Sequence, residues 1–122
     1  MLRLTTRLVT TAAAFLVSAT AVQAFMGDCL LEVDRRIYLD GPCDIGMNRD
    51  GSFTIGVGNR RSDYFAYVDL DPDAPGVARG YWNGAAESTH AHDDLGHLSR
   101  HGGCWINDKA KVCAWKFGTR PN

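Results

Sequence analysis

The chain is 122 residues long, 22% of them charged, with a formal net charge of −1 at pH 7. This length suits one domain with a modest core. A protein that binds nucleic acid needs a clustered basic surface, and this balance of charge argues against that class.

The first 24 residues have the pattern of a secretory signal peptide. Arg3 and Arg7 give a positive start, residues 8–17 are apolar, and Val22-Gln23-Ala24 offers small residues for cleavage. The apolar stretch is too short for a stable membrane span. We therefore expect residues 25–122 to be exported as one β domain, periplasmic or secreted, with no membrane insertion after cleavage.

Short strands and turns alternate along the exported part. The segments "CLLEV" (29–33), "RIYLDG" (36–41), "SFTIGV" (52–57), "DYFAYVDL" (63–70) and "GVARGYW" (76–82) predict strands. A tight turn is predicted at Asn48–Gly51, and the prolines of "DPDAPG" break the chain before the returning strand.

The last third of the chain completes the sheet. Here "LGHLSRH", "CWIN" and "KVCAWK" predict strands, and residues 84–92 are the one segment that could form a helical turn. Asp93, Asp94 and Gly96 suggest a further turn. Together these segments predict an all-β fold, a small antiparallel barrel or sandwich of about seven or eight strands.

Four cysteines lie in the exported part, and an even number in an oxidising compartment predicts two disulfides. We favour Cys29–Cys43 and Cys104–Cys113, because each pair brackets a plausible hairpin. A turn at Asp108-Lys109 would place Cys104 directly opposite Cys113. A bridge between the N-terminal and C-terminal strands remains the alternative. Zinc binding by the thiols would need CxxC-type spacing, which the sequence lacks.

All four histidines fall between His90 and His101. His90 and His92 would point to the same face of an extended strand, and His97 or His101 could complete a zinc or copper site with Asp93 or Asp94. The alternative is a polar loop without metal, and the default expectation is that the protein has no cofactor.

The sequence predicts no enzyme. Ser88 and Ser99 are possible nucleophiles, but neither a GxSxG elbow nor a free cysteine is present. The three tryptophans, Trp82, Trp105 and Trp115, are core candidates, although Trp82 beside Asn83-Gly84 could lie at an exposed rim.

The segments "GGCWINDKAKVCAW", "CLLEVD", "DGPC" and "YFAYV…GYWNG" resemble a group of small exported bacterial disulfide-bonded β proteins, most without an assigned function. A second similarity is to the periplasmic inhibitors of c-type lysozyme, which are compact β-barrels. Ser62 and Tyr64 of "RSDYFAY" match that family's Ser-Gly-x-x-Tyr loop, with one residue missing and no glycine. Trp82, Asn83 and Gly84 match its Trp-Thr-Lys-Gly segment, with Asn83 in place of the lysine.

That similarity implies a binding protein that inserts a loop into the lysozyme cleft, with Ser62, Tyr64, Trp82 and Asn83 as contacts. Loss of Arg3 and Arg7 with the leader lowers the net charge from −1 to −3, which suits a cationic partner. The alternatives are a periplasmic metal-binding module built on His90, His92 and His97, and a structural envelope-associated β domain. We expect a monomer or a dimer.

Overall fold

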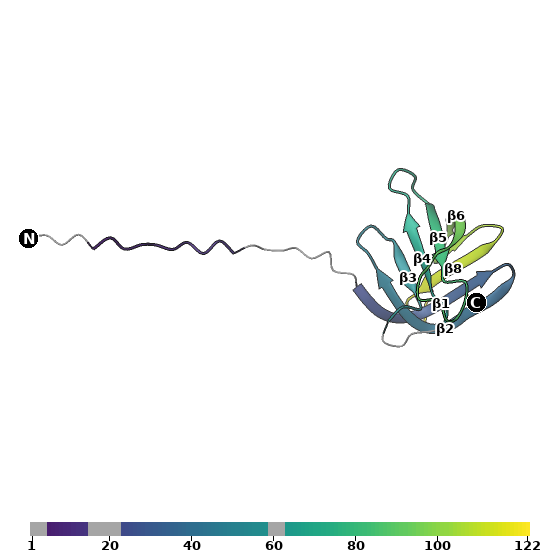
Figure 1. The fold of residues 1–122 in the computed structure, drawn as a ribbon. Helices are drawn as coiled ribbons and strands as arrows, with labels where there is room; N and C mark the ends of the chain where they lie inside the picture. The colour runs from purple at the N-terminus through teal and green to yellow at the C-terminus, as the bar shows by residue number, and fades with distance from the viewer. Residues whose placement is uncertain (1–4, 15–22, 59–62) are drawn as a thin grey trace, which may run out of the picture.

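The structure, a computed structural model, describes residues 5–14, 23–58 and 63–122, and its strands close into a barrel (Figure 1). In these ranges eight strands follow one another around the barrel in chain order, each antiparallel to the next. They are β1 (Gln23–Val33), β2 (Arg36–Met47), β3 (Phe53–Ile55), β4 (Ala66–Leu70), β5 (Val77–Trp82), β6 (Asp93–His101), β7 (Cys104–Ile106) and β8 (Ala110–Trp115). The predicted all-β class is confirmed, as a barrel.

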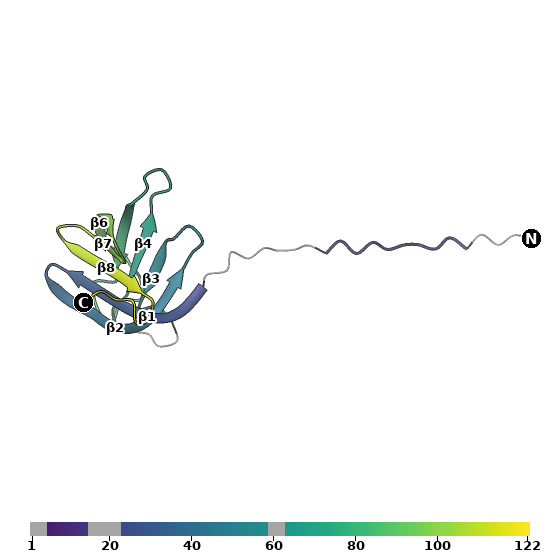
Figure 2. The same ribbon diagram turned by 180° about the vertical axis from the view of Figure 1, so that it is seen from behind.

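Pairing between the last strand and the first closes the barrel (Figure 2). The register runs from Val33 opposite Ala110 to Asp28 opposite Trp115. Closure satisfies the backbone hydrogen-bonding groups that an open sheet would leave at its two edges. The turns at the tips of β1–β2 and β7–β8 also meet, because the Asp34 amide donates to the Lys109 carbonyl at 2.8 Å.

Short turns connect β1 to β2 and β2 to β3. Asn48–Gly51 makes the predicted turn between β2 and β3, where the Gly51 amide donates to the Asn48 carbonyl at 3.1 Å. The turn between β1 and β2 has positive φ at both Asp34 (51°) and Arg35 (66°). This is the twist that a two-residue hairpin requires, achieved here without the glycine that favours it.

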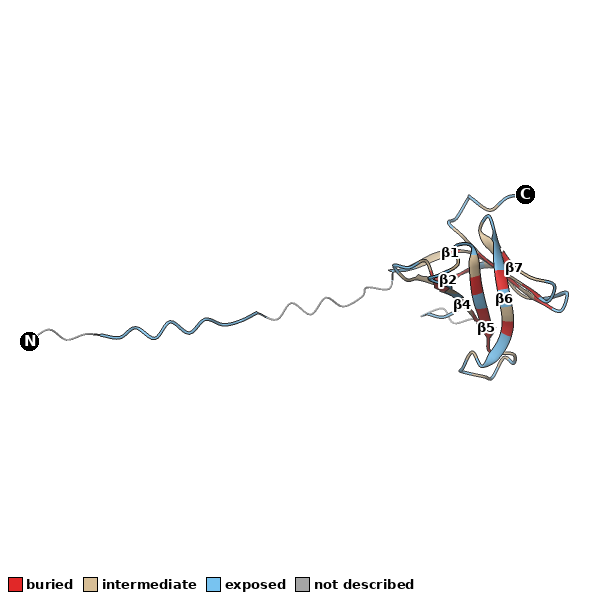
Figure 3. Ribbon diagram, turned by 90° about the horizontal axis from the view of Figure 1, so that it is seen from above, coloured by how far each residue is buried: buried red, intermediate tan, exposed pale blue. Residues whose placement is uncertain are grey.

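Alternate residues of each strand point into the barrel and form the core. Every second residue of β5 is buried, whereas the bulge in β6 puts its buried residues, Leu95 and Leu98, three positions apart (Figure 3). Leu31, Ile45, Ile55, Val68 and Val112 have no exposed surface. These side chains form the core of the barrel, whose interior is narrow, as expected for eight strands.

Both predicted disulfides are present, and the described residues contain no free cysteine. Cys104 lies directly opposite Cys113, with 4.0 Å between their Cα atoms. Cys29 and Cys43 are diagonal neighbours, since Cys29 is paired with Gly41, and their Cα atoms are 5.9 Å apart. Disulfides of this kind are characteristic of an oxidising, extracytoplasmic environment.

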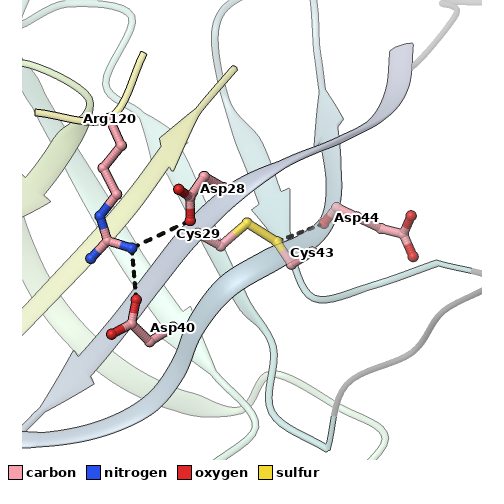
Figure 4. The surroundings of a disulfide bond; sticks show 6 residues. All are labelled: Asp28, Cys29, Asp40, Cys43, Asp44 and Arg120. Carbon is pink, nitrogen blue, oxygen red and sulfur yellow. Dashed lines mark hydrogen bonds and ion pairs between the residues drawn. A yellow bond between two sulfur atoms is a disulfide. The ribbon is translucent and has the colours of Figure 1, made fainter. Parts of the chain in front are cut away.

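Arg120, from the segment after β8, bridges the first two strands (Figure 4). Its Nη1 donates to Asp28 Oδ1 at 3.3 Å and to Asp40 Oδ1 at 2.6 Å. The guanidinium carbon also lies 4.9 Å from the centre of a Trp115 ring. One side chain therefore contacts β1, β2 and β8, on both sides of the closing seam.

Two local expectations are wrong. Residues 84–92 form turns and bends without a helix. Asp93, Asp94 and Gly96 do not form a turn between elements, because they lie inside β6 at a bulge where the register shifts between Gly80 and Tyr81 of β5. The Gly96 amide donates to Asp94 Oδ1 at 2.7 Å, and Gly96 has a φ of +82°. The residue types that suggested a turn therefore stabilise the bulge.

Residues 5–14, part of the expected leader, are exposed and have no regular secondary structure; the rest of residues 1–22 lies outside the described ranges. None of the described segments is a helix of the length and hydropathy needed to cross a bilayer.

Candidate binding site at the loop end of the barrel

Because neighbouring strands are antiparallel, the connections fall at two ends of the barrel. We call one the loop end: it comprises residues 34–35, 56–58, 63–65, 83–92 and 107–109. The other, the open end, comprises residues 48–52, 71–76, 102–103 and the segment after β8. Three of the four predicted partner-binding residues, Tyr64, Trp82 and Asn83, lie at the loop end; the fourth, Ser62, is outside the described residues.

An aromatic cluster closes the loop end. The ring centre of Tyr38 lies 4.9 Å from that of Tyr64 and 4.6 Å from that of Trp82, and Tyr64 and Trp82 are 6.1 Å apart. Trp82 is only 7% exposed, so it belongs to the core. The two tyrosines are half-buried and lie between that tryptophan and solvent.

Tyr38 is a site residue that the sequence did not reveal. β1 and β2 change register between Leu31 and Glu32: Leu31 is opposite Leu39 and Glu32 is opposite Ile37. Tyr38 is therefore an extra residue with no partner in the pairing. Strand alternation alone gives no signal for such a bulge, because the pairing of β1 with β2 decides which residue is left without a partner.

Asn83 ties the loops of this end together. It is 5% exposed; its Oδ1 accepts a hydrogen bond from the Phe65 amide at 3.0 Å. Its Nδ2 lies within donor distance of three carbonyl oxygens, those of Asp63 (2.9 Å), Ala85 (2.9 Å) and Ser88 (3.2 Å). Trp82 and Asn83 are thus buried residues that support the loops. The surface that solvent reaches at this end is formed by the residues around them.

The exposed surface of the loop end combines apolar groups with carboxylates. Ile37 is 57% and Val57 is 45% exposed, which is high for large apolar side chains. The carboxylates of Asp63, Glu87 and Asp93 are exposed at the same end. Aromatic, apolar and charged groups that are exposed at one end of a barrel are suited to protein recognition.

Asp94 is a carboxylate with a fixed ion pair. It accepts hydrogen bonds from the Arg79 guanidinium on the adjacent strand, with Nε at 3.2 Å from Oδ1 and 3.1 Å from Oδ2. The Arg79 hydrogen bond, and then that of the Gly96 amide, lower the pKa of Asp94 below its ordinary value. The carboxylate of Asp94 is therefore already bound by groups of β5 and β6.

Two of the predicted metal ligands come together. The imidazole rings of His90 and His92 lie edge to face with their centres 5.2 Å apart. His97 is on β6 opposite Arg79, and His101 is at the far end of that strand opposite Cys104. Within residues 5–14, 23–58 and 63–122, no three His, Cys, Asp or Glu side chains are grouped as metal ligands would be.

Comparison with known proteins gives no match to a protein-family model, to a curated protein or to a solved structure.

Proposed function

We propose that this protein is an exported binding protein that holds a cationic protein, such as c-type lysozyme, against the loop end of its barrel. The observation that carries the proposal is the contact of the half-buried Tyr38 and Tyr64 over Trp82 at the loop end, where Val57, on the same connection as Tyr64, is also exposed. Tyrosine is enriched at protein interfaces because it buries a large apolar area and keeps a polar group for hydrogen bonding.

Charge supports a cationic partner. The exported part has three more acidic than basic residues. Asp63, Glu87 and Asp93 are exposed at the loop end, which also carries the exposed Arg35 and Lys109 at its hairpin tips. Opposite charge speeds the encounter of two proteins and orients them before contact.

Rigidity supports tight binding. Asn83 fixes the segments 63–65 and 84–88 relative to each other, and the closed sheet carries both. Loops that are ordered before binding lose little conformational entropy when they dock, which favours affinity. Contact by Tyr64 and its exposed neighbours fits this geometry, with Trp82 and Asn83 as the buried support.

The protein is produced by export through its own leader and mixed with hen lysozyme. Lysis of permeabilised bacteria by this mixture is then followed by turbidity. We expect slower lysis at micromolar excess of the protein, and weaker inhibition when the salt concentration is raised, because screening reduces the attraction. Val57→Ser should weaken inhibition roughly tenfold, the effect of losing about 1.4 kcal/mol of apolar burial.

Phe117→Ser is the matched control, since Phe117 is 55% exposed but follows β8 at the opposite end. Its inhibition should equal that of the unaltered protein. Unchanged lysis at every concentration, or equal loss in both variants, would contradict the proposal.

Metal binding by His90 and His92 is the second candidate, favoured by the 5.2 Å approach of their rings. Two imidazoles supply half of a tetrahedral zinc site, and water or a partner's side chain would supply the rest. Calorimetric titration with zinc and with copper tests this. Binding should disappear in the double variant His90→Ala, His92→Ala and persist in His101→Ala.

A further inference from the structure

The open end of the barrel contains a cavity of about 270 Å³ that the loop-end proposal does not use. Its walls are mainly apolar: Met47, Phe53, Leu70, Trp105 and Ala114 come from five different strands. Small-molecule sites have this character and often lie in the mouths of barrels, and this volume is near the lower end of their range.

Several of the residues that border this space are small. Gly51, Gly102, Gly103 and Ala114 border the cavity, whereas Trp82 fills the barrel at the opposite end. An eight-stranded barrel whose interior is not completely filled by its own side chains has room for one small ligand.

Arg100 stands at the rim of this cavity. It is two residues beyond the buried Leu98 on β6, so strand alternation directs it to the inner side, and its paired residue is the cavity-lining Trp105. Its Nε donates to the Gly102 carbonyl at 3.2 Å, which orients the guanidinium. No ion pair of Arg100 is found among the described residues.

The one carboxylate that lines the cavity is engaged elsewhere. Asp50 accepts hydrogen bonds from the Ser52 amide at 2.9 Å and from the Ser52 hydroxyl at 3.0 Å. The rim therefore offers an unpaired, oriented guanidinium above an apolar floor. A guanidinium binds carboxylates through paired, charge-assisted hydrogen bonds.

We propose that the open end binds a small amphipathic carboxylic acid, with its apolar body among Phe53, Leu70 and Trp105 and its carboxylate on Arg100. The ligand is held without covalent change. This site is independent of the loop end, so either can exist without the other.

Calorimetric titration of the exported protein with octanoate tests the proposal. Three other probes each change one property of octanoate. Octanol lacks the negative charge, octylamine has a positive charge instead, and acetate lacks the apolar tail. Octanoate should bind at least tenfold more tightly than any of the three. Arg100→Gln should lower the affinity for octanoate about tenfold and leave that for octanol unchanged.

Two further variants test the location. Arg49→Gln removes an exposed arginine on the neighbouring turn, outside this cavity, and should bind octanoate as the parent does. Ala114→Leu fills the cavity and should abolish binding of both octanoate and octanol, with an unchanged circular dichroism spectrum showing that the barrel has folded.

Three results would overturn the proposal: no binding of octanoate, equal affinity for octanoate and octanol, or equal losses in the Arg100 and Arg49 variants. Titration with phosphatidylglycerol vesicles distinguishes two possible ligands, a free acid and the headgroups of a membrane surface. Binding to these vesicles without binding to free octanoate would assign the site to lipid headgroups and reject the free acid.

Discussion

At the scale of single residues, Asn83 shows how one buried amide organises a surface. It satisfies the Phe65 amide and faces three carbonyl oxygens from two loops. The sequence predicted Asn83 as a contact for a partner, because Trp82, Asn83 and Gly84 are similar to a contact segment of the lysozyme inhibitors. Its burial depends on the packing of the segment 63–65 against its own loop, which the local sequence around Asn83 does not encode.

Replacing Asn83 should therefore destabilise the fold. We expect Asn83→Ala to lower the free energy of unfolding by about 2–3 kcal/mol, since buried polar groups lose their partners. Asn83→Asp should be worse at neutral pH, because a carboxylate would face three carbonyl oxygens, and it should recover as acid protonates it. Urea denaturation measures both, with the exposed Asn122→Ala as control. Equal stability of the Asp and Ala variants at all pH values would contradict this role.

The Arg79–Asp94 pair makes a prediction about pH at the same scale. The folded state lowers the pKa of Asp94, so the pair stabilises the fold above the ordinary carboxyl pKa, and this stabilisation is lost as the pH falls through the lowered value. In Arg79→Gln the pKa of Asp94 should rise toward the ordinary value of 3.8. Carboxyl-carbon NMR titration measures it, and an unchanged pKa would show that the Gly96 amide alone is responsible.

At the scale of elements, the sequence predicted hairpins well, because their signals are local. The turn at Asn48–Gly51, the strand pair around "DPDAPG" and the register that places Cys104 opposite Cys113 are all present. Bulges were missed. Asp93, Asp94 and Gly96 carry the residue types of a turn, and only the neighbouring strand β5 shows that they form a bulge.

The turn between β1 and β2 provides a matched pair of variants. Arg35 has a φ of 66°, which strains any side chain other than glycine by about 1–2 kcal/mol. Arg35→Gly should therefore stabilise the protein by about 1 kcal/mol in urea denaturation, since Asp-Gly suits this turn. Arg36→Gly, one residue along in β2, should destabilise it. Destabilisation by both would show that the Arg35 side chain matters more than its backbone strain.

At the scale of the whole molecule, the sequence predicted an all-β fold with two disulfides but did not distinguish a barrel from a sandwich. The difference lies in the pairing of β1 with β8, which joins segments from the two ends of the domain. The periodicity of each strand is the same in both architectures. The cavity at the open end was missed for this reason too, because its walls come from five strands.

The two disulfides should contribute unequally to stability. Each closes a short loop, with sequence separations of 14 and 9, so loop entropy alone predicts about 3 kcal/mol for either. Cys29 and Cys43 are also both buried in the core. Replacing that pair by alanine should therefore lower the unfolding free energy further than replacing Cys104 and Cys113. Thermal denaturation of the two double variants tests this order; the reverse order would contradict it.

The contacts of Arg120 make the barrel sensitive to what happens at its C-terminus. Loss of the chain from Arg120 onward would remove the guanidinium and leave Asp28 and Asp40, on neighbouring strands, without this cation. A purification tag fused after Asn122 would be attached two residues from this contact. Handles for labelling or immobilisation are better inserted in the exposed loop 71–76, which connects β4 and β5.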